Sequence, residues 1–125
     1  MPHILVVEDD EMLSRMYQRE FEDQGYKVTL AMDGQAGLAA AESMPDAILL
    51  DIVMPKLDGM GVLEALKADP KLKSIPVVVI TNLTSSNEIA QALKLGAARY
   101  IQKSDQKPKQ VEETIREVLD QNSAT

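Results

Sequence analysis

Hydrophobic and polar positions follow one another along the chain in a regular pattern of strand-like and helix-like segments. Continuous apolar runs occur at 3–7 (HILVV), 47–50 (AILL) and 77–80 (VVVI), and the first of them is rich in β-branched residues. Runs of this kind are typical of strands buried on both faces. The segments 27–30 (KVTL) and 99–102 (RYIQ) are less apolar and predict two further, weaker strands. The pattern therefore predicts five short strands.

Helix-like segments separate these strands. Apolar residues at three- and four-residue spacing from Met12 to Phe21 predict an amphipathic helix that ends near Gly25. Alanine-rich, capping and proline signals predict the other helices at 36–43, about 61–68, from the Ser85–Glu88 capping box to about 96, and 108 to about 121.

Strands that alternate with helices indicate right-handed βαβ units around a parallel sheet. The three continuous runs are the first, third and fourth strands, so the weaker second and fifth strands should lie at the edges. This is the flavodoxin-like strand order 2-1-3-4-5, a doubly wound α/β fold with a five-stranded sheet and five helices. We expect one domain over residues 1–121 and a disordered tail at 122–125.

Composition and charge exclude several classes of function. The net charge of −7 argues against direct binding to nucleic acid, which requires a basic surface. No apolar run approaches the ~20 residues that span a bilayer, and no secretory leader is visible. The chain has no cysteine, so a cytoplasmic location is expected. Its methionines, apart from Met54 beside Asp51, are interpreted as core residues.

Polar residues follow the predicted strands at their carboxyl ends, where ligands bind in a sheet of this order. They are Glu8-Asp9-Asp10 after the first strand, Asp51 after the third, Thr81-Asn82 after the fourth and Lys103 after the fifth. Each taken alone fits an ordinary helix cap, turn residue or solvated side chain. Their convergence at one edge of the sheet favours a common site.

The chemistry of these residues suggests phosphoryl transfer. Carboxylates from neighbouring strands repel one another unless a cation lies among them, and Mg²⁺ prefers such oxygen ligands. Asp51 is then a candidate nucleophile that forms an acyl phosphate. Lys103 and the Thr81 hydroxyl are candidates to stabilise the phosphoryl oxygens.

Four blocks of the sequence resemble, in order and spacing, the receiver domain of two-component response regulators. They are ILVVEDDE, LLDIVMPKLDG, VVVITN and ALKLGAARYIQKS, and the resemblance covers essentially the whole chain. It implies roles for the residues at matching positions: Glu8 and Asp9 as metal-binding acids with the Val53 carbonyl, Asp51 as phosphoacceptor, Lys103 as the family's lysine, and Thr81 and Tyr100 as the switch pair. Asp10 is expected to be a first-turn acid of the following helix.

Two positions depart from the family pattern. Asn82 stands where a small residue usually follows the threonine, which should narrow access to the pocket. Ser104 stands where proline usually follows the lysine. We expect the Lys103–Ser104 peptide bond to be trans, because a cis bond without proline costs ~3 kcal/mol.

The resemblance implies a phosphorylation-controlled signalling switch that depends on Mg²⁺. A sensor histidine kinase or phosphotransfer protein would donate to Asp51. The face formed by the fourth helix, fifth strand and fifth helix would meet an effector or a fused output domain. The domain would transfer and hydrolyse its own phosphoryl group but would not be an enzyme acting on an external substrate.

Three functions are alternatives to a phosphorylation-controlled switch. A flavin- or nucleotide-binding carrier of this fold needs a phosphate-binding loop after the first strand, and Glu8-Asp9-Asp10 repels an anion. A phosphatase with an aspartyl-phosphate intermediate needs an acid two residues after Asp51, where Val53 stands. A degenerate receiver that only binds partners remains as the alternative.

Overall fold

The computed structural model describes residues 1–52, 59–81 and 86–123. Its strands are β1 (His3–Val7), β2 (Lys27–Ala31), β3 (Ala47–Asp51), β4 (Val77–Thr81) and β5 (Arg99–Gln102). Its helices are α1 (Glu11–Asp23), α2 (Gly34–Ala41), α3 (Gly59–Ala68), α4 (Ser86–Lys94) and α5 (Pro108–Ser123), with a short 3₁₀ helix at Lys103–Asp105. Within these residues, no helix is both long enough and apolar enough to cross a membrane.

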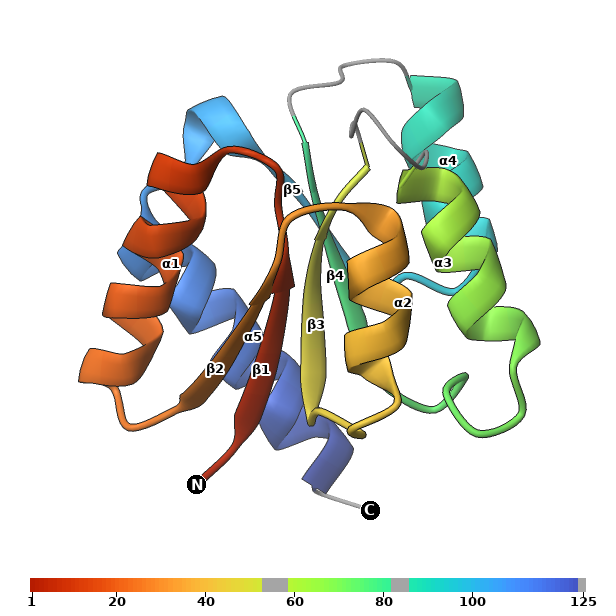
Figure 1. The fold of residues 1–125 in the computed structure, drawn as a ribbon. Coiled ribbons are helices and arrows are strands. Elements are labelled where there is room, and N and C mark those ends of the chain that lie inside the picture. The colour runs from red at the N-terminus through yellow and green to blue at the C-terminus, as the bar shows by residue number, and fades with distance from the viewer. Residues whose placement is uncertain (53–58, 82–85, 124–125) are drawn as a thin grey trace.

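The five strands form one parallel sheet in the order β2-β1-β3-β4-β5 (Figure 1), which confirms the predicted fold. The register pairs Val7 with Leu50 and Asp51 with Ile80. The carboxyl ends of β1, β3 and β4 therefore meet at the same edge of the sheet. All residues of β3 and β4 are buried, as their continuous apolar sequences predict.

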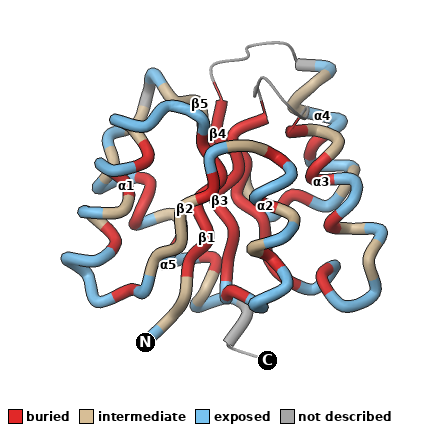
Figure 2. The backbone as a smooth tube through the Cα atoms, viewed as in Figure 1, coloured by how far each residue is buried: buried red, intermediate tan, exposed pale blue. Residues whose placement is uncertain are grey.

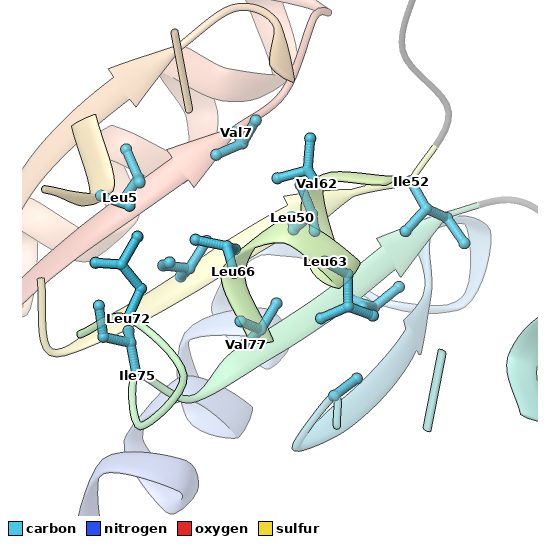
Figure 3. Packing of buried hydrophobic residues seen from close by; sticks show 14 of the residues in the cluster. Leu5, Val7, Leu50, Ile52, Val62, Leu63, Leu66, Leu72, Ile75 and Val77 are labelled. Carbon is cyan, nitrogen blue, oxygen red and sulfur yellow. The ribbon is translucent and has the colours of Figure 1, made fainter. Parts of the chain in front are cut away.

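Alternate residues of each central strand point to opposite faces, where two hydrophobic cores form. Figure 2 shows that β3 and β4, at the centre of the sheet, are buried. Leu5 and Val7 of β1 face the core covered by α2 and α3, which Figure 3 shows from close by. Ile4 and Val6 face the second core, which Tyr17 and other side chains of α1 and α5 complete. The chain thus forms three layers, with helices on both faces of the sheet.

The helix boundaries differ from the predicted ones by a few residues. Helix α2 begins at Gly34 rather than 36, because the Asp33 side chain accepts a hydrogen bond from the Ala36 amide and caps the helix. Helix α3 begins at Gly59 rather than 61, and α5 extends to Ser123. The Ser85 side of the predicted capping box lies outside the described residues.

The prediction that the methionines fill the core was wrong for most of them. Tyr17 and Phe21 occupy the buried face of α1, so Met12 and Met16, one turn apart, lie on its outer side. Among the described methionines only Met60 packs against a core, partly buried. The exposed ones are Met1, Met12, Met16, Met32 and Met44, with exposed fractions from 38% to 92%. Met54 lies outside the described residues.

A groove of about 700 Å³ lies at the amino-terminal edge of the sheet. Its lining includes Met1 and Pro2 from the start of the chain and Leu119 and Asp120 from the end of α5. The two ends of the described chain therefore lie at the same edge (Figure 1), opposite the carboxyl ends of the strands.

Candidate functional site

Two buried carboxylates stand where β1 and β3 end. The Glu8 amide donates to the Ala31 carbonyl (3.0 Å), which continues the pairing of β1 with β2 by one residue. Glu8 and Asp51 are 1% and 3% exposed. By the alternation of the strands, Glu8 follows Ile4 and Val6 on the face covered by α1 and α5, and Asp51 follows Leu49 on the same face. Strand geometry therefore turns both acids toward one side of the sheet.

Lys103 joins these two acids. It is the first residue of the 3₁₀ helix after β5, and its side chain is only 16% exposed. Its Nζ donates a hydrogen bond to Asp51 Oδ2 (2.9 Å) and forms an ion pair with Glu8 Oε1 (2.6 Å). Three elements far apart in the sequence thus meet at one ammonium group.

The electrostatics of this cluster reflect its burial. Burial raises the pKa of Glu8 to about 7, and the charge of Asp51 acts in the same direction. The ion pair with Lys103 and the Asp10 amide, which donates to Glu8 Oε2 (3.1 Å), oppose that rise. Burial lowers the pKa of Lys103, but its bonds to Glu8 and Asp51 outweigh burial and raise it. Lys103 is therefore the permanent cation of the cluster.

Asp9 completes a group of three neighbouring carboxylates. One carboxylate oxygen each from Glu8, Asp9 and Asp51 lies within 4.8 Å of the others. Asp9 is exposed, so the cluster is open to solvent on its side. Hard oxygen donors with room for water suit a divalent cation such as Mg²⁺. Val53, whose carbonyl is an expected further ligand, lies outside the described residues, as does Asn82.

Asp10 has a different role from the one expected. It precedes α1 in an extended conformation, and its Oδ1 accepts a hydrogen bond from the Leu13 amide (3.1 Å). Asp10 is thus the N-cap of α1, and Glu11 is the acid of the first turn. A short polar side chain just before the first turn of a helix can accept a hydrogen bond from a backbone amide that has no partner within the helix.

Thr81 and Tyr100 lie on the other face of the sheet. Thr81 ends β4 and is fully buried, and alternation places it on the side of Val79, which faces the core of α2 and α3. Val79 pairs with Tyr100, which is partly buried against the same core. Burial and the charge of Glu88 on α4 raise the pKa of Tyr100. The threonine and the aromatic residue are therefore diagonal neighbours on one face.

The backbone around Lys103 agrees with the expectation for Ser104. No peptide bond within the described ranges is cis, so the Lys103–Ser104 bond is trans.

The sequence analysis missed one neighbour of the site, Tyr17, which the helical spacing predicts only as a core residue. Its burial, together with the charges of Glu8 and Asp51, raises the pKa of Tyr17. Its position in the second turn of α1, after the acidic residues, is the only signal in the sequence.

Acids, a hydroxyl and a lysine lie together at the carboxyl edge of this flavodoxin-like parallel sheet. This combination is typical of a class of signalling domain rather than of a cofactor carrier. Comparison of the sequence with known protein families gives the same class. The chain belongs to the response regulator receiver domain family, which it matches over residues 4–116. Receiver domains act in phosphorylation-based signalling by two-component systems.

Three relatives illustrate the similarity. The chain is 44% identical over 101 residues to the response regulator PleD of Caulobacter vibrioides, covering 80% of this chain and 22% of PleD. A CheY-like receiver domain protein from Methanospirillum hungatei is 30% identical, with a TM-score of 0.89 and coverage of 99% and 98%. The Mn²⁺-bound response regulator Rcp1 is 32% identical, with a TM-score of 0.77 and coverage of 82% and 81%. The chain spans about half or less of the length of the curated relatives it matches.

Proposed function

We propose that this domain is a signalling switch in which Asp51 accepts a phosphoryl group from the phosphohistidine of a sensor kinase or phosphotransfer protein. The observation that carries the proposal is the position of Asp51. It is a buried carboxylate at the end of a central strand, held by Lys103 at 2.9 Å beside a second buried acid, Glu8. A carboxylate buried at this cost, with a cation and an open acidic side, is suited to chemistry rather than to packing.

The transfer step uses Asp51 and Lys103 of the cluster, together with Thr81 at the end of the neighbouring strand β4. A carboxylate oxygen of Asp51 attacks phosphorus, and the P–N bond of the phosphohistidine breaks. The bonding electrons remain on the imidazole nitrogen, and the product is an acyl phosphate on Asp51. Lys103 would donate to one phosphoryl oxygen, and the Thr81 hydroxyl to another.

A divalent cation fits the same proposal. Glu8, Asp9 and Asp51 would hold it, with the Val53 carbonyl as a further proposed ligand. The bound ion would neutralise charge on the carboxylate and phosphoryl oxygens. The Mn²⁺-bound structure of the related Rcp1 supports a divalent cation in a domain of this kind. Mg²⁺ is the ion we propose for this chain.

The conformational change caused by phosphorylation would reach the partner-binding surface through Thr81 and Tyr100. A phosphoryl group that binds the Thr81 hydroxyl favours the conformation in which this contact forms, so it shifts a pre-existing equilibrium. Tyr100 shares the sheet face of Thr81, and the charge of Glu88 on α4 acts on its hydroxyl. The face of α4, β5 and α5 is thus the proposed contact for an effector or a fused output domain.

Labelling with acetyl phosphate and Mg²⁺ tests the assignment of Asp51. The wild type should take up one phosphoryl group that is labile in acid and in alkali, and Asp51→Asn should take up none. Asp46→Asn, at the opposite edge of the sheet, is the matched control and should label like the wild type. Stoichiometric labelling of Asp51→Asn contradicts the assignment. A wild type that takes up no label favours a degenerate receiver.

A further inference from the structure

We infer that Lys67 is a positioning residue that fastens the carboxyl-terminal end of α4 to the loop between α3 and β4. A movement of α4 on phosphorylation would then pivot at that end, and the amino-terminal end, which follows Thr81 along the chain, would move most. The pivot rests on the proposed function. The fastening is a property of the unphosphorylated domain and is tested separately.

The ammonium group of Lys67 turns inward instead of extending into water. Lys67 lies in the last turn of α3, and its Nζ donates hydrogen bonds to the backbone carbonyls of Lys73 (3.0 Å) and Ile75 (2.9 Å). Burial lowers the pKa of Lys67, so this placement has a cost that a solvated lysine avoids. Neither carbonyl belongs to α3, so the contact is not an ordinary cap of its own helix. The side chain instead holds the loop that leads to β4.

The aliphatic part of Lys67 lies over the turn that ends α4. A Cβ atom on Gly96 would lie 3.3 to 3.4 Å from Cγ, Cδ and Cε of Lys67, so the lysine stem packs against the glycine backbone. Gly96 has φ +112°, a conformation that favours glycine. Just after it, the Ala97 amide donates to the Ala92 carbonyl (3.1 Å) and closes the end of the helix. One side chain thus connects the end of α3, the loop before β4 and the turn after α4.

The remainder of α4 is held by few buried side chains. Within residues 87–94, only Ala92 is fully buried, and Leu93 is 48% exposed. Helix α5, by contrast, buries Val111, Ile115 and Val118. The turn after α4 is tied to the sheet as well, because the Ala98 amide donates to the Val77 carbonyl of β4 (2.8 Å). A helix that is anchored at one end and lightly packed elsewhere should open and move from its other end.

The turn after α1 provides an internal reference. Gly25 has φ +92°, and the Tyr26 amide donates to the Phe21 carbonyl (3.1 Å), the same pattern that joins Ala97 to Ala92. A Cβ atom on Gly25 would meet nothing within 4 Å, so no described side chain covers this glycine. Comparison of the Ala97 and Tyr26 amides therefore separates the effect of Lys67 from a general loss of stability.

Native-state hydrogen exchange of the unphosphorylated domain tests the fastening. Lys67→Met keeps an aliphatic stem but removes the N–H donors, so the Ala97 amide should exchange about tenfold faster than in the wild type, while the Tyr26 amide is unchanged. Lys67→Arg keeps charged donors and should restore most of the protection. Lys71→Met removes an exposed lysine of the same loop and should change neither amide. Equal acceleration of both amides in Lys67→Met, or none at Ala97, overturns the inference.

A second variant keeps this test decisive if Lys67→Met does not fold. Lys67→Gln retains an amide donor on a shorter stem, so it should accelerate exchange at Ala97 by a smaller factor than full removal of the donors. An Ala97 amide that is as well protected in a folded Lys67→Gln domain as in the wild type overturns the fastening.

Backbone NMR after treatment with acetyl phosphate and Mg²⁺ tests the pivot. In the wild type, the amide resonances of residues 87–90 should shift more than those of residues 96–98. In Lys67→Met, the shifts at 96–98 should roughly double, because the anchored end is released. Equal shifts along α4 in a wild type that labels normally refute the pivot alone. A wild type that takes up no phosphoryl group refutes the proposed function and the pivot with it, whereas the exchange result decides the fastening in either case.

Discussion

Gly59 lies so close to the end of β3 that no side chain fits there. A Cβ atom on Gly59 would lie 2.2 Å from Ile52 Cα and 2.5 Å from the Asp51 carbonyl oxygen. The Gly59 amide also donates to the Ile52 carbonyl (3.1 Å). The first turn of α3 therefore rests directly on the backbone that presents Asp51.

Gly59→Ala should strongly destabilise the domain and reduce the proposed phosphorylation of Asp51. The clash is with backbone atoms, which cannot rotate away, so we expect a loss of roughly 3–5 kcal/mol in the free energy of unfolding. Urea denaturation and acetyl phosphate labelling measure the two effects.

Gly25→Ala is the control for this prediction. Gly25 has φ +92°, but a Cβ atom at this position would meet nothing within 4 Å. Only backbone strain of about 1–2 kcal/mol is therefore expected from the substitution. Equal losses in the two variants would show that the close approach at Gly59 is not the cause.

The positions of Asp51, Thr81 and Lys103 follow from the sequence, because each comes at the end of a strand-forming run and the topology brings these ends to one edge. The contact between Glu8 Oε1 and Lys103 does not follow. It depends on the rotamers of two long side chains and on the 3₁₀ turn that begins at Lys103. Neither leaves a pattern in the sequence.

At the scale of single elements, the two adjacent acids before α1, Asp9 and Asp10, have different roles. Asp9 offers an oxygen to the group of three carboxylates that we propose as the metal site, whereas Asp10 caps the helix through the Leu13 amide. Asp10→Ala should therefore cost about 1 kcal/mol of unfolding free energy, and Asp10→Asn, which keeps an acceptor oxygen, should cost little. Thermal or urea denaturation measures both variants.

Metal binding provides the check on this division. Asp10→Asn should bind Mg²⁺ much like the wild type, and Asp9→Asn should bind it clearly more weakly, because it loses a charged ligand. If the two variants lose affinity equally, Asp10 takes part in the metal site and the division is wrong.

Among the elements, the apolar strands are predicted well and the outer surfaces of helices poorly. A run such as VVVI at 77–80 has no polar face, so only burial on both sides accommodates it. Met12 and Met16 fit the helical spacing of α1 as well as Tyr17 and Phe21 do. The width of the buried stripe decides between them, and it depends on α5 and the sheet, which the helix sequence alone does not contain.

For the molecule as a whole, stability should depend on the protonation of His3, the only histidine in the chain. Burial, together with the charge of Lys27, lowers the pKa of His3, while Asp46 opposes the change. Below pH ~6.5 the unfolded chain therefore binds more protons than the folded chain, so His3 reduces stability as the pH falls and has no effect above that range.

This dependence can be isolated by substitution. The difference in unfolding free energy between pH 7.5 and pH 5.5 should be smaller in His3→Gln than in the wild type, with metal absent from both. An NMR titration of the imidazole should give a pKa below 6.5, and Lys27→Met should move it upward. An imidazole that titrates above 6.5 would contradict the predicted direction.

Met1 and Asp120 line the same groove, and this closeness of the two chain ends has a practical consequence for fusing other proteins to the domain. Both ends of the described chain leave from the edge of the sheet farthest from Asp51 (Figure 1). A fluorescent reporter fused at either end would extend away from Asp51 and leave the proposed phosphorylation site accessible. The same proximity favours circular permutation, in which a short linker joins the two ends and new termini are opened in an exposed turn such as the one at Gly25.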